Sequence, residues 1–172
     1  MKIKNLFANL FLILCIFFLG GEGFAQDPTK DLLKVGTKAP DFTLPLLGGK
    51  KATLSAIVKK NKVTLLNFWA IYCPPCIEEL PHLNKLATKY GKKGFGVIAT
   101  NVGGTREDVA RFWAKNKLTL RSAYNGDPVS VKYRVDVIPC NYLIGKNGKI
   151  IAAMIGYQEK EILAALKKAG IK

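Results

Sequence analysis

Lys62-Val63-Thr64-Leu65-Leu66-Asn67-Phe68-Trp69-Ala70-Ile71-Tyr72-Cys73-Pro74-Pro75-Cys76 is the stretch that decides the fold of this chain. Its first half is an apolar run that ends at Trp69, which predicts a buried β-strand. Two cysteines separated by two prolines follow. Beyond Cys76, apolar residues recur at helical spacing, at Ile77, Leu80, Leu83 and Leu86. The stretch therefore predicts a strand that leads into a cysteine pair at the N-terminus of a helix.

The position of the cysteine pair indicates redox chemistry. Unpaired N–H groups and the helix macrodipole favour the thiolate at a helix N-terminus, where the pKa of a cysteine falls from about 8.5 to roughly 3.5–7.5. Cys73, at the very end, is the predicted attacking sulfur. Cys76, about one turn further on the same face, is predicted to resolve the mixed disulfide and close a Cys73–Cys76 disulfide. Pro74 and Pro75 suit the first helical turn, where a missing N–H removes no intrahelical bond.

The alternative interpretation of Cys-x-x-Cys is half of a zinc site or a structural bridge. Zinc requires a second cysteine pair, or a histidine pair, at ligand spacing. The chain has a single histidine, His82, and no second Cys-x-x-Cys. Redox chemistry is therefore preferred, and neither a metal nor any other cofactor is expected.

Two motifs resemble known proteins. Phe68-Trp69-Ala70 before the cysteine pair is similar to thioredoxin, with Tyr72 where a second tryptophan is usual. Val35-Gly36-Thr37-Lys38-Ala39-Pro40-Asp41-Phe42-Thr43-Leu44, together with Asn67, resembles the exported TlpA/ResA branch of thiol-disulfide oxidoreductases. This resemblance runs from about Val35 to the C-terminus. It implies a thioredoxin-like three-layer α/β/α sandwich with a mixed central sheet and an N-terminal β-hairpin extension. It also implies reduction of envelope proteins, with apocytochrome c as one candidate substrate.

The N-terminal region predicts export. Residues 1–25 combine two lysines, an apolar run and small residues before a cleavage point after Ala25, which is typical of a secretory signal peptide; an uncleaved anchor is the alternative. Residues 26–34 are a predicted tether and residues 35–172 the thioredoxin-like domain. We expect a periplasmic or other extracytoplasmic location, with membrane contact only if the N-terminal segment stays uncleaved. The expected partners are an exported protein disulfide as substrate and a membrane thiol-disulfide electron donor.

Other elements can be predicted from local patterns. Thr105 starts a helix with a capping box in which Asp108 replaces the usual Glu or Gln. The remaining predictions are a hairpin of residues 39–45 with 51–54, a strand over 95–102, a short helix over 128–133, strands over 141–144 and 150–155, and a helix over 158–168.

The resemblance also implies a substrate-binding surface. In the thioredoxin family, a cis-proline that follows Ile, Val or Thr faces the cysteine pair, and Ile138-Pro139 resembles that feature. Proline lacks an N–H, so neighbouring backbone groups stay free to pair with an extended substrate. The residues expected around the substrate are Trp69, Tyr72, Pro74, Pro75, Ile138, Pro139 and Cys140.

Cys140 departs from the family pattern, because the position after the cis-proline is generally Thr or Ser. If the fold is correct, its sulfur lies near the cysteine pair. It is either a small buried residue that packs like threonine, or a third thiol that forms an alternative disulfide or holds a soft ion such as Cu(I). A Cu(I)-binding chaperone that uses Cys73, Cys76 and Cys140 is therefore one alternative function. A thiol peroxidase is another, but peroxiredoxins place threonine where this chain has Ala70.

A second departure concerns the proton acceptor for the resolving thiol. Thioredoxin carries a buried aspartate at the position of Asn67, and that carboxylate is missing here. Glu79 lies three residues after Cys76, on the same helix face, and matches a glutamate with this role in the ResA-like branch. A partly buried Glu79 would have a raised pKa and could shuttle the Cys76 proton. The alternative is a solvated helix glutamate.

The chain is strongly basic. Removing Lys2, Lys4 and Glu22 from its 27 basic and 12 acidic residues leaves 25 and 11, a net charge near +14 for the mature domain. The lysines are not interleaved with aromatic residues, and export argues against DNA, so no nucleic-acid partner is expected. We interpret them as a solvated face that steers acidic partners or adheres weakly to anionic membranes.

Overall fold

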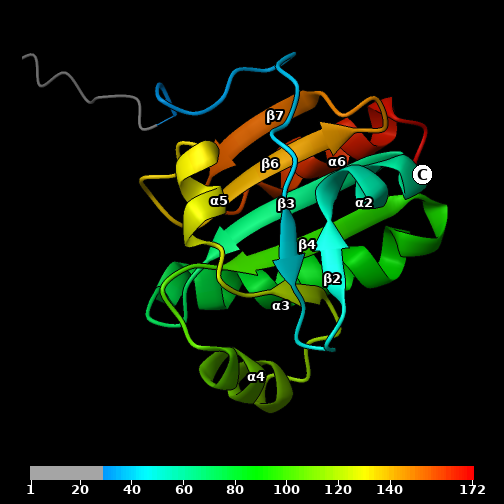
Figure 1. Cartoon of the computed structure of the whole chain (residues 1–172). Coiled ribbons are helices and arrows are strands. Elements are labelled where there is room, and N and C mark those ends of the chain that lie inside the picture. The colour runs from blue at the N-terminus through cyan, green and yellow to red at the C-terminus, as the bar shows by residue number, and fades with distance from the viewer. Residues whose placement is uncertain (1–28) are drawn as a thin grey trace, which may run out of the picture.

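The centre of the molecule is the predicted apolar strand, β3 (Val63–Trp69), within a five-stranded sheet. The computed structural model describes residues 29–172 and is shown in Figure 1. The strand order is β5-β4-β3-β6-β7, and β3 runs parallel to β4 and antiparallel to β6. The sheet is therefore mixed, as predicted. Every residue of β3 is buried, so packed side chains cover both faces of the sheet at its centre.

The other elements follow in chain order. The strands are β1 (Thr43–Pro45), β2 (Lys51–Thr53), β4 (Phe95–Asn101), β5 (Arg121–Ala123), β6 (Cys140–Gly145) and β7 (Ile150–Ile155). The helices are α2 (Leu54–Lys60), α3 (Pro74–Tyr90), α4 (Arg106–Lys115), α5 (Asp127–Lys132) and α6 (Glu159–Lys168), with a short 3₁₀ helix η1 (Gly91–Lys93).

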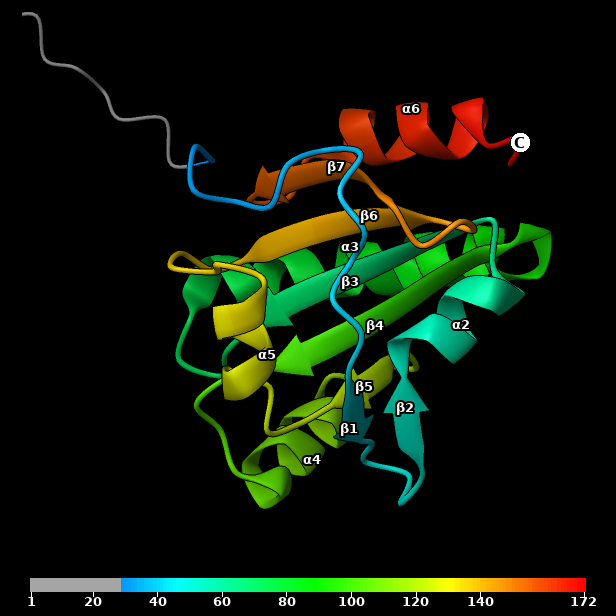
Figure 2. The same ribbon diagram turned by 45° about the horizontal axis from the view of Figure 1, so that its top comes forward.

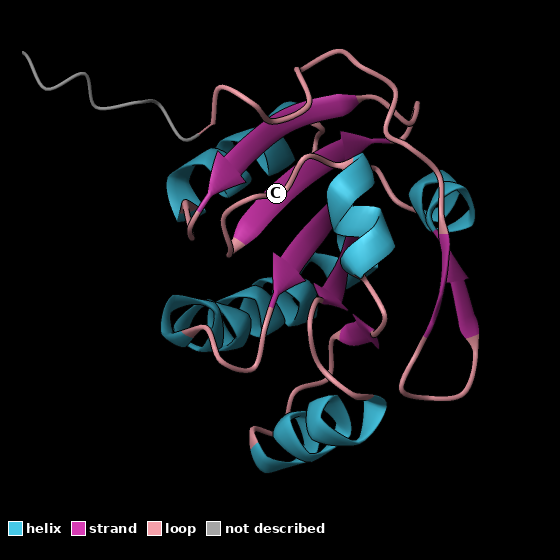
Figure 3. Ribbon diagram, turned by 60° about the vertical axis from the view of Figure 1, so that its left-hand side comes forward, coloured by secondary structure: helices cyan, strands magenta, loops and turns pink. Residues whose placement is uncertain are grey.

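Helices lie on both faces of the sheet. Figures 1 and 3 show α3 and α6 behind one face and α2 and α5 in front of the other. This is the expected three-layer arrangement. The predicted N-terminal hairpin is also present: β1 pairs antiparallel with β2, and Figure 2 shows both strands beside α2. A bridge between Leu46 and Ala123 joins this hairpin to β5.

Two helix N-termini follow from local chemistry. The hydroxyl of Thr105 accepts the backbone N–H of Asp108 at 3.2 Å and donates to its carboxylate at 2.6 Å, so the predicted cap of α4 is confirmed. Helix α3 begins at Pro74, because Cys73 is its N-cap. The short strand β5 was not predicted, since Arg-Ser-Ala carries no apolar alternation.

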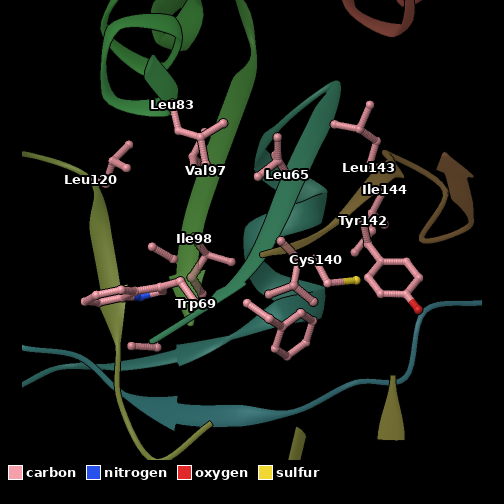
Figure 4. Packing of buried hydrophobic residues seen from close by; sticks show 14 of the residues in the cluster. Leu65, Trp69, Leu83, Val97, Ile98, Leu120, Cys140, Tyr142, Leu143 and Ile144 are labelled. Atoms are coloured by element: carbon pink, nitrogen blue, oxygen red, sulfur yellow. The ribbon is translucent and has the colours of Figure 1, made fainter. Parts of the chain in front are cut away.

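The core has two parts, one on each face of the sheet. Figure 4 shows Leu83 of α3 beside Val97, with Leu65 and Leu143 further along the same side of the sheet. The opposite face holds an aromatic cluster, in which the ring centroid of Phe68 lies 5.5 Å from that of Tyr133 and 6.4 Å from that of Tyr142. These two parts fix β3 and β6 relative to α3, and this relation positions the cysteines.

The start of the described chain packs against the domain. Leu32 is buried, and the backbone N–H of Leu33 donates to the Tyr142 hydroxyl at 3.1 Å. That hydroxyl in turn donates to the carbonyl oxygen of Tyr133. The end of the predicted tether, residues 26–34, is therefore part of the fold. The predicted signal peptide, residues 1–25, lies outside the described residues. Over residues 29–172, no helix has the length and apolar character that crossing a membrane requires.

Candidate active site

The cysteine pair lies at the N-terminus of α3, directly after β3. Cys73 and Cys76 form a disulfide, with their Cα atoms 5.3 Å apart. The backbone N–H of Cys76 donates to the sulfur of Cys73 at 3.3 Å, and Pro74 and Pro75 open the helix as predicted. The helix N-terminus therefore stabilises negative charge on the Cys73 sulfur when the pair is reduced.

The two cysteines differ in exposure. Cys73 is 7% exposed, whereas Cys76 is 0% exposed. Only Cys73 can meet the sulfur of an incoming protein disulfide, since attack requires direct contact between sulfur atoms. This difference supports the predicted order, in which Cys73 attacks and Cys76 resolves.

The loop before β6 faces Cys73. The carbonyl oxygen of Ile138 lies 3.7 Å from the Cys73 sulfur, and the Ile138–Pro139 peptide bond is cis. Ile138 is half-buried and Pro139 is buried. The structure therefore brings together the cysteine pair and the Ile-Pro pair, which lie far apart in the sequence.

An exposed rim surrounds the cysteines. Tyr72 is 67% exposed, and Pro74 and Pro75 are also exposed. The Tyr72 hydroxyl lies against Gly103, where a Cβ atom would be only 2.8 Å away, and Gly103 has a φ of +69°. A side chain at Gly103 would therefore displace Tyr72. Val137, next to Ile138, is 47% exposed and adds an apolar contact surface to the rim.

Trp69 is a predicted substrate contact that the structure places inside the core. It is 0% exposed, and its ring centroid lies 5.2 Å from those of both Phe112 and Trp113. This burial argues against a direct substrate contact, contrary to the expectation from the sequence. The tryptophan instead holds α4 against the end of β3.

Cys140 is also a predicted substrate contact that the structure buries. It is free and 0% exposed, and it pairs with Phe68 on the sheet face away from α3, where Figure 4 shows its sulfur directed at the Tyr142 ring. Burial raises the pKa of its thiol to about 12. This burial matches the alternative in which Cys140 packs as a small residue, and Cys140 takes no part in the disulfide. Throughout the described chain, no group of three or more His, Cys, Asp or Glu side chains could hold a metal ion.

Glu79 is almost fully buried, on the face of α3 that meets the sheet. Its side chain is 1% exposed, and burial raises the pKa of its carboxyl group to about 7. The Asn141 amide donates to one carboxyl oxygen, Oε1, at 2.6 Å, which partly offsets that rise. Within residues 29–172, the other oxygen, Oε2, has no hydrogen-bond partner. Glu79 thus combines a pKa near neutrality with a free acceptor position, one turn after Cys76.

Two asparagines support Glu79 from the sheet. Asn67 and Asn141 lie opposite each other in the β3–β6 register. The side-chain amide of Asn67 donates to the side-chain oxygen Oδ1 of Asn141 at 3.1 Å, and the side-chain amide of Asn141 also donates to the backbone carbonyl oxygen of Gly156 at 3.2 Å. Asn141 was missed in the sequence analysis. The signal that could have found it is a single polar residue inside an apolar strand, because buried amides need partners.

Replacing Asn141 with alanine removes the only hydrogen bond to the Glu79 carboxylate in the described structure. We expect the pKa of Glu79 to rise further above its value of about 7, because that hydrogen bond stabilises the ionised form. Carboxyl-carbon NMR of the oxidised protein measures this pKa, since the bonded cysteines do not titrate there. Asn101→Ala is the matched control: Asn101 is equally buried but donates to the Trp69 carbonyl oxygen. An unchanged Glu79 pKa in Asn141→Ala would contradict the proposed support.

Comparison with known proteins covers most of the chain. The redoxin family model matches residues 34–169. The thiol-disulfide oxidoreductase ResA of Bacillus cereus is 36% identical over 157 residues, which span 90% of this chain and 88% of that protein.

Solved structures agree in fold. A Chlorobium tepidum protein assigned as the thiol:disulfide interchange protein DsbE superposes with a TM-score of 0.71 at 35% identity, covering 78% of this chain and 99% of that one. The thioredoxin domain of a thiol-disulfide oxidoreductase from Bacteroides vulgatus has a TM-score of 0.70 at 24% identity, covering 79% and 97% of the two chains. The second likeness supports the fold alone.

Proposed function

This chain belongs to the redoxin family and is a protein thiol-disulfide oxidoreductase, and from that premise we propose that it reduces disulfides of exported proteins. The observation that carries the proposal is the Cys73–Cys76 disulfide at the N-terminus of α3, with its more exposed sulfur beside the Ile138 carbonyl group. Envelope proteins, including an apocytochrome c, are the proposed substrate class. Export by the N-terminal segment and an extracytoplasmic location are part of the same proposal.

The first step is attack by the Cys73 thiolate on one sulfur of a substrate disulfide. A bond forms between Cys73 and that sulfur, the substrate disulfide breaks, and the other substrate sulfur leaves as a thiolate. Tyr72, Pro74, Pro75 and Ile138 form the proposed surface that receives the substrate, and Pro139 holds the loop beside Cys73. In this proposal, backbone groups near Ile138 pair with an extended segment of the substrate.

The second step releases the reduced substrate. Glu79 accepts the proton of the Cys76 thiol, and the Cys76 thiolate attacks the Cys73 sulfur. The Cys73–Cys76 disulfide forms and the second substrate sulfur leaves as a thiolate, so two electrons have passed to the substrate. A thiol-disulfide electron donor at the membrane is the proposed partner that reduces the pair again.

The midpoint potential of the Cys73–Cys76 pair tests the direction of electron flow. We expect a two-electron transition near or below about −250 mV, the range of reducing thioredoxins, whereas an oxidase would lie near about −120 mV. The measurement is a titration against defined thiol-disulfide buffers, with alkylation and mass readout of each cysteine. A potential near the oxidase value overturns the reductase proposal. The readout also reports Cys140, which we expect to remain a free thiol throughout.

A further inference from the structure

The lysines of the described domain gather at the end of the molecule opposite the cysteines. Helices α2, α3 and α6 end there, and β3 and β4 begin there (Figure 1). We call this region the basic end and define it by ten exposed lysines: Lys59, Lys60, Lys62, Lys89, Lys92, Lys93, Lys146, Lys149, Lys167 and Lys168.

Hydrogen bonds and shared cavities link these segments in space. The backbone N–H of Lys146 donates to the carbonyl oxygen of Lys62 at 3.1 Å. The Lys62 ammonium donates to the carbonyl oxygen of Gly170 at 3.3 Å, and Lys168 lines one cavity together with Lys62 and Lys146. Lys59 lines another cavity with Lys146. The ten charges therefore form one surface that is assembled from separate parts of the chain.

No acidic residue lies in the segments that build the basic end, which are residues 57–62, 86–94, 145–150 and 165–171. Asp41 and Glu161 each line a cavity beside these lysines, and the Lys93 ammonium donates to the main-chain oxygen of Lys172. Both ion pairs found in the described chain lie on α4. The positive charge of the basic end is thus largely uncompensated.

Helix macrodipoles explain only part of this pattern. Lysines in the last turns of α2, α3 and α6 complement the negative helix ends. That explanation does not cover Lys62, which precedes β3, or Lys146 and Lys149, which lie in the turn between β6 and β7. The accumulation of charge at one end therefore calls for a negatively charged partner.

The side-chain chemistry identifies the class of partner. All ten cations are lysines, although the described chain also has arginines at other places. Arginine suits bidentate recognition of individual carboxylates or phosphates, whereas lysine acts as a flexible, hydrated point charge. Among the exposed large apolar side chains of residues 29–172, only Ile151 lies beside these lysines, in the cavity lined by Lys62, Lys146 and Lys168. One such side chain does not make the apolar core that a specific protein interface needs. A diffuse anionic surface such as a phospholipid bilayer fits both observations.

We propose that the basic end docks the domain on an anionic phospholipid surface. Strand β3 begins directly after Lys62 and leads to the loop that carries Cys73, a length of about 20 Å for its seven residues. Docking by the basic end therefore turns the cysteine pair toward the aqueous phase. This membrane contact needs no N-terminal anchor, so it adds to the contact expected from an uncleaved segment. The docking proposal does not depend on whether the cysteine pair reduces or oxidises its substrates.

Partition of the full chain between buffer and lipid vesicles tests the proposal. The vesicles contain phosphatidylcholine alone, or phosphatidylcholine with about 30% phosphatidylglycerol. Any insertion of the apolar N-terminal segment contributes to both, so the ratio of the two partition coefficients isolates the charge-dependent part. We expect a ratio of about ten or more at low salt, falling to near one at about 0.5 M NaCl, because salt screens such contacts.

Two matched variants locate the surface. Lys60→Gln/Lys92→Gln/Lys146→Gln/Lys168→Gln removes four charges from the basic end, and Lys50→Gln/Lys85→Gln/Lys115→Gln/Lys132→Gln removes four exposed charges elsewhere. We expect the first variant to lose most of the anionic preference, by about tenfold, and the second to lose less than about threefold. Equal losses would show an effect of net charge alone and would overturn the proposal, as would a ratio near one for the unaltered chain.

Two further measurements test the orientation of the docked domain and the chemical class of its partner. The rate at which a dithiol reduces the Cys73–Cys76 disulfide should change by less than about twofold on anionic vesicles, because the cysteines face away from the lipid. A larger slowing contradicts the orientation. Soluble polyglutamate serves as the acidic-polypeptide probe. If it binds the full chain in preference to anionic vesicles, the partner of the basic end is a protein and the membrane proposal fails.

Discussion

Replacing Cys73 with serine should abolish disulfide exchange, with a loss of at least about 10³-fold in the rate of reduction of a protein disulfide. Cys76 cannot replace the missing nucleophile, because it is fully buried behind Cys73. The measurement is single-turnover reduction of a disulfide-bonded protein by the pre-reduced domain. Cys140→Ser is the matched control, since Cys140 is free and buried on the other face of the sheet. It should retain activity within about threefold, because a buried thiol with a raised pKa supplies no nucleophile.

Cys76→Ser should behave differently from Cys73→Ser. The Cys73 thiolate still attacks, but no second thiol resolves the product, so the mixed disulfide accumulates. Non-reducing electrophoresis with mass spectrometry should find one substrate molecule bound through Cys73. Trapping in Cys73→Ser but not in Cys76→Ser would reverse the two roles, and trapping through Cys140 would show that Cys140 is the attacking thiol.

Glu79→Gln should slow the resolving step by about 10²-fold near pH 7, because glutamine cannot accept the Cys76 proton. The pre-formed mixed disulfide on Cys73 isolates this step, and its rate of breakdown is followed against pH. In the unaltered protein the rate should rise with the ionisation of Glu79, whose pKa is about 7. Glu78→Gln is the control, because Glu78 is the exposed neighbour on the same helix. A pH profile that is the same in Glu79→Gln and in the unaltered protein would remove Glu79 from the mechanism.

The same substitution should change how stability depends on pH. The pKa of Glu79 rises from an ordinary value of 4.5 to about 7 in the folded protein, so the folded state holds the proton more tightly than the unfolded state. The free energy of unfolding therefore falls as pH rises from about 4.5 to about 7, by about 3 kcal/mol in total. Denaturant unfolding of the oxidised protein across this range should show the fall, and Glu79→Gln should lack it. Tyr157 and Cys140, the titratable neighbours with pKa values near 12, stay protonated throughout.

Much of the fold could be predicted because its central elements have strong local patterns. The run from Val63 to Trp69 is apolar throughout, and the helix after it keeps its apolar spacing to Leu86. Strand β5 could not be found in this way. Its three residues are held by pairing with β4 and by a bridge from Leu46, so its structure comes from tertiary neighbours and not from its own sequence.

The residues of the candidate site also differ in how well they could be predicted from local sequence patterns. Cys73, Cys76 and Glu79 follow from helix spacing, and the structure places them as expected. The structure differs from the expectation at Trp69 and Cys140, which were expected at the substrate surface: both are fully buried, as are the residues on either side of each. Asn141 was missed because its importance depends on a contact with Glu79 across 62 positions of the chain. Successive side chains of a strand point to opposite faces of the sheet, so the face decides which residues can meet. The pairing with neighbouring strands sets the register, and the sequence of one strand alone does not show it.

The hydrogen bond from Leu33 to Tyr142 fixes where the N-terminal part of the described chain joins the domain. Tyr142 lies opposite Leu66, near the middle of the central strand. The chain therefore enters the domain between the basic end and the cysteine pair, and not at either of them. A membrane tether attached at this point would favour neither end, so the surface charge of the domain would decide which end faces the lipid.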